Sequence, residues 1–171
     1  ITAYEKFISP AYWTKHNADG DKVVLNAAGV EAFNKKIIAA SPTVYDMAAY
    51  PKTLSGKTVT AYVNTHTDLS DELYREGKLV SDNYKNILRS QTNAAAIPAE
   101  VTVRYGVTVR RANLRNLPTG EGLFFYASDR NFDALQETAL DPGEAVAILH
   151  TSTNGYFYYV QAYNYRGWLS K

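Results

Sequence analysis

Hydrophobic and polar positions along the chain change their period near residue 100. Before that point, apolar residues recur at helical spacing and predict a helix over 27–39, with Asn26 as its N-cap. The apolar positions of this helix are Val30, Phe33 and Ile37. A second amphipathic segment predicts a helix over 82–92, capped by Ser81.

Other parts of the first half carry weaker patterns. Residues 58–63 alternate and are rich in β-branched side chains, which predicts a strand. Residues 70–77 predict a short helical turn that ends at Gly77. The Ala-rich segment 93–100 is the expected linker, because the apolar pattern changes directly after it.

Beyond the linker the pattern has a period of two, which is typical of strands. We expect short strands at 101–105, 107–111, 145–151, 156–163 and 166–169. Residues 116–134 interrupt them as a long loop, and Asn154–Gly155 predicts a tight hairpin. The chain is therefore expected to be α+β: a mainly helical or irregular segment over 1–97, then an all-β, SH3-like barrel over 98–171.

Charge gives no reason to expect a nucleic-acid partner, since the net charge of the 171 residues is only +1. The densest basic run contains Arg104, Arg110, Arg111 and Arg115. Along a strand, Arg111 and Arg115 would share one face, and Arg104 and Arg110 the other, so we expect a solvated strand rather than a single-faced patch. No apolar window approaches the roughly 18 residues that span a bilayer.

Candidate chemistry is sparse. The chain has no cysteine, so a disulfide, a thiolate metal site and a cysteine nucleophile are excluded within it. His16, His66 and His150 lack metal-site spacing, and we expect neither a metal nor a cofactor. The sequence starts at Ile1 without a basic and apolar leader, so we expect any export signal to have been removed or never to have been present.

Aromatic residues are dense near the C-terminus. In a strand, Tyr156 and Tyr158 share one face, and Phe157 and Tyr159 the other. One set is expected in the barrel core and the other outside it. Exposed aromatics beside a long loop are how SH3 barrels hold extended peptides, although an ordinary aromatic core remains the alternative for each residue.

Several motifs in the second half resemble the bacterial SH3 domain that accompanies NlpC/P60-type cell-wall peptidases. They correspond to Arg-x-x-Leu-Arg-x-x-Pro-Thr, Asp-x-Leu-Gln-x-(Ser/Thr)-Ala-Leu, Leu-His-x-Ser and Tyr-Asn-Tyr-x-Gly-Trp, and here they begin at Arg111, Asp133, Leu149 and Tyr163. The likeness is strong over 101–169. Residues 1–97 resemble, more loosely, the N-terminal clip segment that precedes the barrel in such enzymes.

The resemblance implies a non-catalytic module of a γ-D-glutamyl-L-diamino acid endopeptidase, which positions or binds a peptidoglycan stem peptide. The implied partner is an NlpC-type catalytic domain in the same or another chain, and the implied location is the cell envelope, periplasmic or secreted. A carboxylate or tyrosine hydroxyl suits the ammonium group at the free end of a stem peptide. The candidate ligand-binding residues are Glu121, Tyr126, Asp129, Asp133, Tyr163, Tyr165 and Trp168.

Other functions stay open at this point. An adaptor or inhibitor that docks on a cell-wall hydrolase, without touching peptidoglycan, is the main alternative. A hydrolase with unrecognised chemistry would need titratable groups that converge in a cleft. A eukaryotic-style SH3 module is disfavoured, because its Ala-Leu-Tyr-Asp-Tyr strand and paired Trp are missing.

Overall fold

The computed structural model describes residues 4–171, and the chain divides into two compact units after Ala40. The first unit contains the helices α1 (Glu5–Ile8), α2 (Pro10–His16) and α3 (Ala27–Ala40). Asn26 caps α3 as expected: its Oδ1 accepts the Gly29 N–H at 2.8 Å. None of the helices within residues 4–171 is long and apolar enough to cross a membrane.

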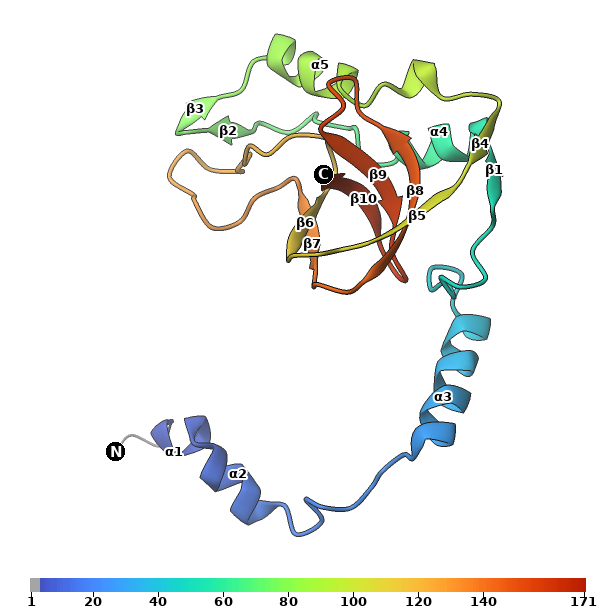
Figure 1. Cartoon of the computed structure of the whole chain (residues 1–171). Helices are drawn as coiled ribbons and strands as arrows, with labels where there is room; N and C mark the ends of the chain where they lie inside the picture. The colour runs from blue at the N-terminus through green and yellow to red at the C-terminus, as the bar shows by residue number, and fades with distance from the viewer. Residues whose placement is uncertain (1–3) are drawn as a thin grey trace. The chain divides into compact units, whose positions relative to one another are not determined.

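The second unit holds the remaining elements (Figure 1). In chain order they are β1 (Thr53–Ser55), α4 (Gly56–Asn64), β2 (Tyr74–Arg75), β3 (Lys78–Leu79), α5 (Asp82–Ser90), the 3-10 helix η1 (Ala94–Ala96), β4 (Glu100–Thr102), β5 (Arg104–Val107), β6 (Ala112–Arg115), β7 (Gln136–Leu140), β8 (Ala145–Thr151), β9 (Phe157–Gln161) and β10 (Arg166–Ser170). The α+β fold class is confirmed.

The main sheet is antiparallel, with the strand order β5-β8-β9-β10-β6-β7, and it curls into a barrel (Figure 1). The expected hairpin at Asn154–Gly155 joins β8 to β9, and Gly155 takes a φ of 76°, which favours glycine. The strands β6 and β7 flank the long loop, and neither of them was expected from the sequence.

Three apolar clusters stabilise this unit. One lies between the sheet and α4 and includes Val59, Val63, Leu149 and Trp168. Another lies beneath α5 and the long loop and includes Leu88, Leu117, Leu123 and Leu135. The third fills the barrel interior and includes Leu114, Val146, Val160 and Leu169.

The strand expected over 58–63 is wrong, because this segment belongs to helix α4. The Ser55 hydroxyl accepts the Thr58 N–H at 3.1 Å and thereby caps the helix. Val59 and Val63 are one helical turn apart and are both buried against the sheet. Burial of these two side chains outweighs the strand preference of β-branched residues.

The helical turn expected over 70–77 is also wrong, because Tyr74–Leu79 forms the β2–β3 hairpin. Its turn residues Glu76 and Gly77 both have positive φ, at 52° and 82°. Positive φ at both central positions is the geometry of a tight hairpin turn.

The strand expected over 107–111 is wrong after its first residue. β5 ends at Val107, and residues 108–111 turn before β6 begins. The Thr108 hydroxyl donates to the Asp141 carbonyl at 2.5 Å, and the Thr108 N–H donates to the Glu144 carbonyl at 3.0 Å. These contacts fix the turn against the β7–β8 connection. Arg110 and Arg111, which follow Thr108, therefore do not alternate between the two faces of a strand.

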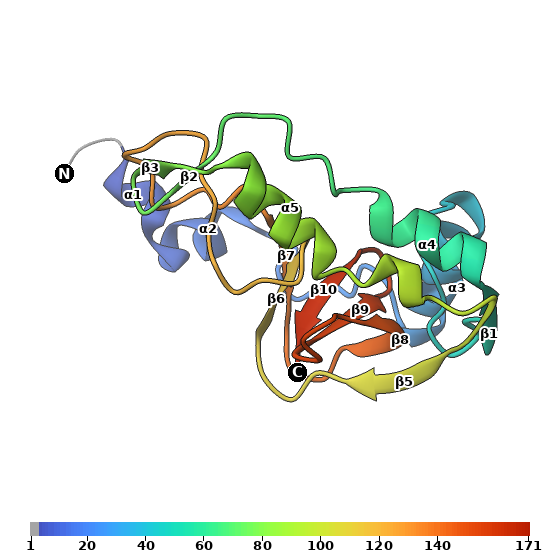
Figure 2. The ribbon, with the colours of Figure 1, turned by 90° about the horizontal axis from the view of Figure 1, so that it is seen from above.

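Hydrogen bonds at several places join residues 41–97 to the barrel that follows them. β1 pairs with β4, and Gly56 N–H donates to the Ala99 carbonyl at 2.7 Å. The C-terminal end of α5 contacts the β8–β9 turn, where Thr153 N–H donates to the Gln91 carbonyl at 3.0 Å (Figure 2). Residues 41–97 therefore pack with the barrel in one unit, and a domain boundary at 97/98 stays a prediction.

The expected division of the aromatic sets holds in part: Phe157 and Tyr159 pack inward, and of the other set Tyr156 is 71% exposed whereas Tyr158 is half-buried. Tyr159 packs in the cluster beside α4, and Tyr158 packs against the barrel interior. The α4 segment covers what would otherwise be the exposed face of the strand.

Candidate functional site

An ion pair closes the base of the long loop between β6 and β7. Arg115 Nη1 lies 2.7 Å from Asp133 Oδ2, and Arg115 Nη2 donates to the Glu121 carbonyl at 2.6 Å. Asp133 Oδ1 also accepts the N–H groups of Leu123 and Leu135, at 3.1 and 3.0 Å. Arg115 is only 5% exposed. Asp133 therefore stabilises the loop conformation with both carboxylate oxygens, one in the ion pair and one in backbone hydrogen bonds.

Glu121 occupies a different position on the same loop. Its carboxylate accepts a hydrogen bond from the Tyr84 hydroxyl at 2.9 Å and is also paired with Arg75, whose Nη2 lies 2.8 Å from Oε1. The Glu121 side chain is 44% exposed. Burial, followed by the hydrogen bond and charge of Glu121, raises the pKa of Tyr84.

Three elements bring these side chains together. Glu121 comes from the long loop, Tyr84 from the first turn of α5 and Arg75 from β2, and a Tyr74–Phe124 bridge joins the loop to the hairpin. A hollow of about 240 Å³ lies beside the group. It is lined by Arg75, Glu76, Lys78, Leu79, Val80, Ser81 and Tyr84. The arrangement presents a partly exposed carboxylate next to a hydroxyl group.

Tyr126 and Asp129 lie at the tip of the loop. Tyr126 is 72% exposed. Asp129 Oδ1 accepts the N–H groups of Asn131 and Phe132, at 2.8 and 3.3 Å. These backbone hydrogen bonds, chiefly the one from Asn131, lower the pKa of Asp129 and keep its carboxylate charged.

The three aromatic candidates separate in the structure. Trp168 has no exposed surface and packs edge-on against Tyr159. Tyr163 and Tyr165 are exposed, and Tyr165 borders a hollow of about 190 Å³. That hollow is also lined by Thr43, Tyr45, Thr65, His66, Glu137, Tyr159, Gln161, Asn164 and Arg166. Trp168 therefore belongs to the core and offers no surface to a ligand.

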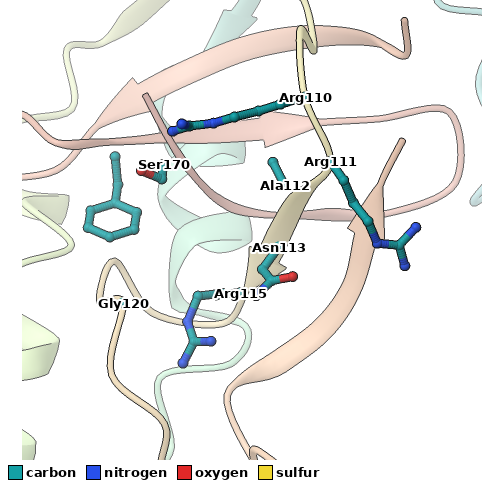
Figure 3. A pocket seen from close by; sticks show the side chains of 8 residues that line it. Arg110, Arg111, Ala112, Asn113, Arg115, Gly120 and Ser170 are labelled. Carbon is teal, nitrogen blue, oxygen red and sulfur yellow. The ribbon is translucent and has the colours of Figure 1, made fainter. Parts of the chain in front are cut away.

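A larger hollow, of about 440 Å³, lies where the turn before β6 meets the long loop (Figure 3). It is lined by Arg110, Arg111, Ala112, Asn113, Arg115, Gly120, Phe157 and Ser170. The expected division of the arginines between two strand faces is wrong here, because the chain turns at 108–111 instead of continuing as a strand. The turn brings Arg110, Arg111 and Arg115 to one hollow.

The described part of the chain offers no group of three or more His, Asp or Glu side chains that could hold a metal ion. Among the histidines, His150 is half-buried in β8, and its Nε2 lies 3.0 Å from the Asn93 carbonyl oxygen. Desolvation lowers the pKa of His150, which favours the neutral ring.

Sequence reasoning missed Arg75, Tyr84 and Arg110 as site residues. Nothing local to Arg75 or Tyr84 indicates a site, because Glu121 meets them from a distant part of the chain. Arg110 was visible in the basic run, but the turn that directs it was not. No local signal indicated the turn at 108–111, because the β-branched residues Val107, Thr108 and Val109 favour a strand.

Comparison with known proteins agrees with this fold. Residues 123–170 match the family model of an SH3 domain of the SH3b1 type. The match covers the end of the long loop and strands β7 to β10, and this part of the barrel is similar to a bacterial SH3 domain of that type. No curated protein sequence matches the chain.

The structure is similar to a solved NlpC/P60 endopeptidase from Photobacterium damselae subsp. piscicida, with a TM-score of 0.65 and 16% sequence identity. The similarity covers 91% of this chain, so the two proteins share a fold over nearly all of it. The chain spans 39% of the length of that endopeptidase.

Proposed function

We propose that this chain is a non-catalytic module that positions a peptidoglycan stem peptide for a cell-wall endopeptidase of the NlpC type. The SH3b1-type domain and the fold shared with an NlpC/P60 endopeptidase support this proposal. The catalytic partner would be an NlpC-type domain, in the same or another chain. The module would act in the cell envelope, in the periplasm or outside the cell.

The observation that carries the proposal is the partly exposed Glu121 carboxylate beside the Tyr84 hydroxyl. A carboxylate offers about four acceptor positions on its two oxygens. Tyr84 and the two contacts from Arg75 occupy three of them. The remaining position on this partly exposed carboxylate suits the ammonium group at the free end of a stem peptide.

Tyr126 and Asp129 lie on the same loop and add an exposed aromatic ring and a charged carboxylate. In this proposal they contact the peptide beyond its amino end. Asp133 acts indirectly, because its ion pair with Arg115 fixes the loop that carries Glu121. Tyr163 and Tyr165 are both exposed and form a further candidate contact surface, of which Tyr165 borders a separate hollow.

The test is calorimetric titration with a stem tripeptide in two forms, one with a free amino end and one N-acetylated. We expect saturable binding that favours the free amine, without cleavage. Glu121→Gln should weaken binding of the free amine about tenfold and leave binding of the acetylated form nearly unchanged, since hydrogen bonds to charged groups contribute about 1.5–3 kcal/mol.

Glu100→Gln is the matched control, because it removes an exposed carboxylate from β4 and should leave both affinities unchanged. Equal binding of the two peptide forms by the unaltered protein would contradict the role of Glu121. If neither form bound while a cell-wall hydrolase did, the docking role of an adaptor or inhibitor would replace the proposed function.

A further inference from the structure

The arginine-lined hollow of Figure 3 adjoins an apolar one. The second hollow, of about 200 Å³, shares Arg110, Ala112 and Ser170 with the first. Its wall is mainly apolar and reaches the interior of the barrel through Val146, Val160 and Leu169. The remaining lining residues are Gly106, Val107, Thr108, Val109, Ile148, Tyr158 and Lys171. Together the two hollows form a site with an apolar part and a cationic part.

No acidic residue lines either hollow, whereas the linings include Arg110, Arg111, Arg115 and Lys171. This excess is local, because the whole chain has 18 basic and 17 acidic residues. Such a concentration of one sign of charge attracts a ligand of the opposite sign.

Two of these cations are already paired. Arg115 is paired with Asp133, and Arg111 with Asp141. Arg110 is exposed and has no ion pair or hydrogen bond from its side chain within residues 4–171. In Figure 3 the Arg110 side chain extends toward Ser170, while Arg111 points away from it. Arg110 is therefore the available cation where the two hollows meet.

Arg115 supplies a second observation. It is buried, and its Nε has no hydrogen-bond partner although the other guanidinium nitrogens are bonded. A buried donor without an acceptor is unfavourable, and an anion in the hollow would improve its electrostatic environment.

The apolar hollow has further cations at its rim. Lys171 Nζ lies 4.3 Å from the centre of the Tyr158 ring, and the Arg104 guanidinium lies 5.1 Å from it. These two cations, Lys171 more than Arg104, lower the pKa of Tyr158. The rim is therefore positive on this side as well.

We infer that the joined hollows bind the carboxylate end of a short peptide, with Arg110 and Ser170 at the carboxylate and a small apolar side chain over the barrel interior. The choice of a peptide as ligand rests on the proposed function. An inorganic anion alone would leave the apolar hollow unfilled, whereas a terminal alanine supplies both a methyl group and a carboxylate.

The position of this site relative to Glu121 supports the inference. Gly120 borders the arginine-lined hollow, and Glu121 is the next residue along the loop. Both candidate positions therefore draw on the same loop, although the Glu121 carboxylate is directed to Arg75 and Tyr84. One loop thus contributes to two positions of opposite charge, and a short stem peptide carries one charged group for each.

The experiment uses the full chain labelled with ¹⁵N and two probes, acetyl-alanyl-alanine with a free carboxylate and the same dipeptide as its C-terminal amide. Neither probe has an amino group, so the Glu121 site is not required. We expect saturable shifts of the Arg110, Gly120 and Ser170 amide signals with the carboxylate, and at least tenfold weaker binding of the amide.

Arg110→Gln should weaken carboxylate binding about tenfold without affecting the fold, because its side chain is exposed and unbonded. Lys57→Gln is the control: it makes the same charge change on α4 and should have no effect. Glu121→Gln should also leave binding of the acetylated carboxylate unchanged. This separates the inference from the proposed function.

The inference is overturned if the amide binds as tightly as the carboxylate, if Arg110→Gln has no effect, or if the carboxylate gives no saturable shifts. It is also overturned if inorganic phosphate gives the same shifts at the same concentration, since the site would then select only negative charge.

Discussion

Arg115 and Asp133 form a 2.7 Å ion pair between the end of β6 and the end of the long loop. The side chain of Arg115 is 6% exposed and that of Asp133 is 17% exposed, so water screens this pair little. The loop that carries Glu121 depends on this contact for its shape.

Asp133→Asn should therefore destabilise the protein strongly. It leaves the Arg115 charge buried without a partner, and loss of one member of a buried pair destabilises by about 3–5 kcal/mol. We expect the lower part of this range, because Asp133 is partly exposed. Urea unfolding followed by Trp fluorescence measures the change.

Asp141→Asn is the matched control, because it breaks the exposed ion pair with Arg111. That change should alter the free energy of unfolding by less than about 1 kcal/mol. Equal effects of the two substitutions would show that the Arg115–Asp133 pair has no special role in the loop.

Gly56→Ala should destabilise the start of α4. A Cβ at this position would lie 1.9 Å from the Pro98 carbonyl oxygen, which belongs to backbone and cannot rotate away. We expect a loss of about 2–4 kcal/mol, in the range of severe overpacking. Thermal unfolding measures it.

Gly120→Ala provides the comparison, because a Cβ there meets nothing within 4 Å. It should stabilise slightly, by about 0.4–1 kcal/mol, through the lower entropy of the unfolded chain. A Gly56→Ala variant as stable as the Gly120→Ala variant would mean that residues 98–99 do not approach α4 so closely.

Stability should fall at alkaline pH because of buried tyrosines. Burial is the main cause that raises the pKa of Tyr50 to about 12, and burial also raises the pKa of Tyr159. Tyrosine in the unfolded chain ionises near pH 10, so the unfolded state loses protons first. Stability should be complete below about pH 10 and decline as the pH rises through about 12.

Tyr50→Phe should reduce this alkaline loss, whereas Tyr126→Phe, at an exposed position, should not. Urea unfolding at several pH values, with ultraviolet absorbance to follow tyrosinate, measures both effects. Ionisation of all tyrosines in one step near pH 10, without unfolding, would contradict the prediction.

Stability should also fall on mild acidification because of His150. Its pKa is lowered by desolvation, although the hydrogen bond to the Asn93 carbonyl opposes this shift. The unfolded state therefore takes up its proton first, and the stability that the neutral ring contributes is lost as the pH falls below about 6.5. Melting temperatures between pH 8 and pH 5 test the direction, and ¹H NMR titration of the His150 ring gives its pKa. A value at or above 6.5 would contradict the assignment.

Local signals were sufficient for several elements. Asn26 and Ser81 begin helices because their side chains accept backbone N–H groups a few residues ahead, and this depends only on nearby sequence. The hairpin at Asn154–Gly155 formed as expected because glycine readily adopts the positive φ that the turn requires. The motifs between Arg111 and Trp168 were sufficient to indicate a bacterial SH3 domain.

Other features depended on contacts between distant residues. Residues 58–63 have the composition of a strand, but burial of Val59 and Val63 against the sheet makes them helical. Glu121 meets Tyr84 and Arg75 only because the loop, α5 and β2 converge.

The sequence by itself determined the caps, the hairpin turn and the β-rich second half, since each follows from the conformational preference of a few neighbouring residues. Only the tertiary structure decided which charges are buried, paired or available. Asp133 and Glu121 are both acidic residues of one loop, yet Asp133 is used internally by Arg115 while Glu121 remains partly exposed. The difference arises from burial and from partners distant in the sequence, which local pattern does not encode.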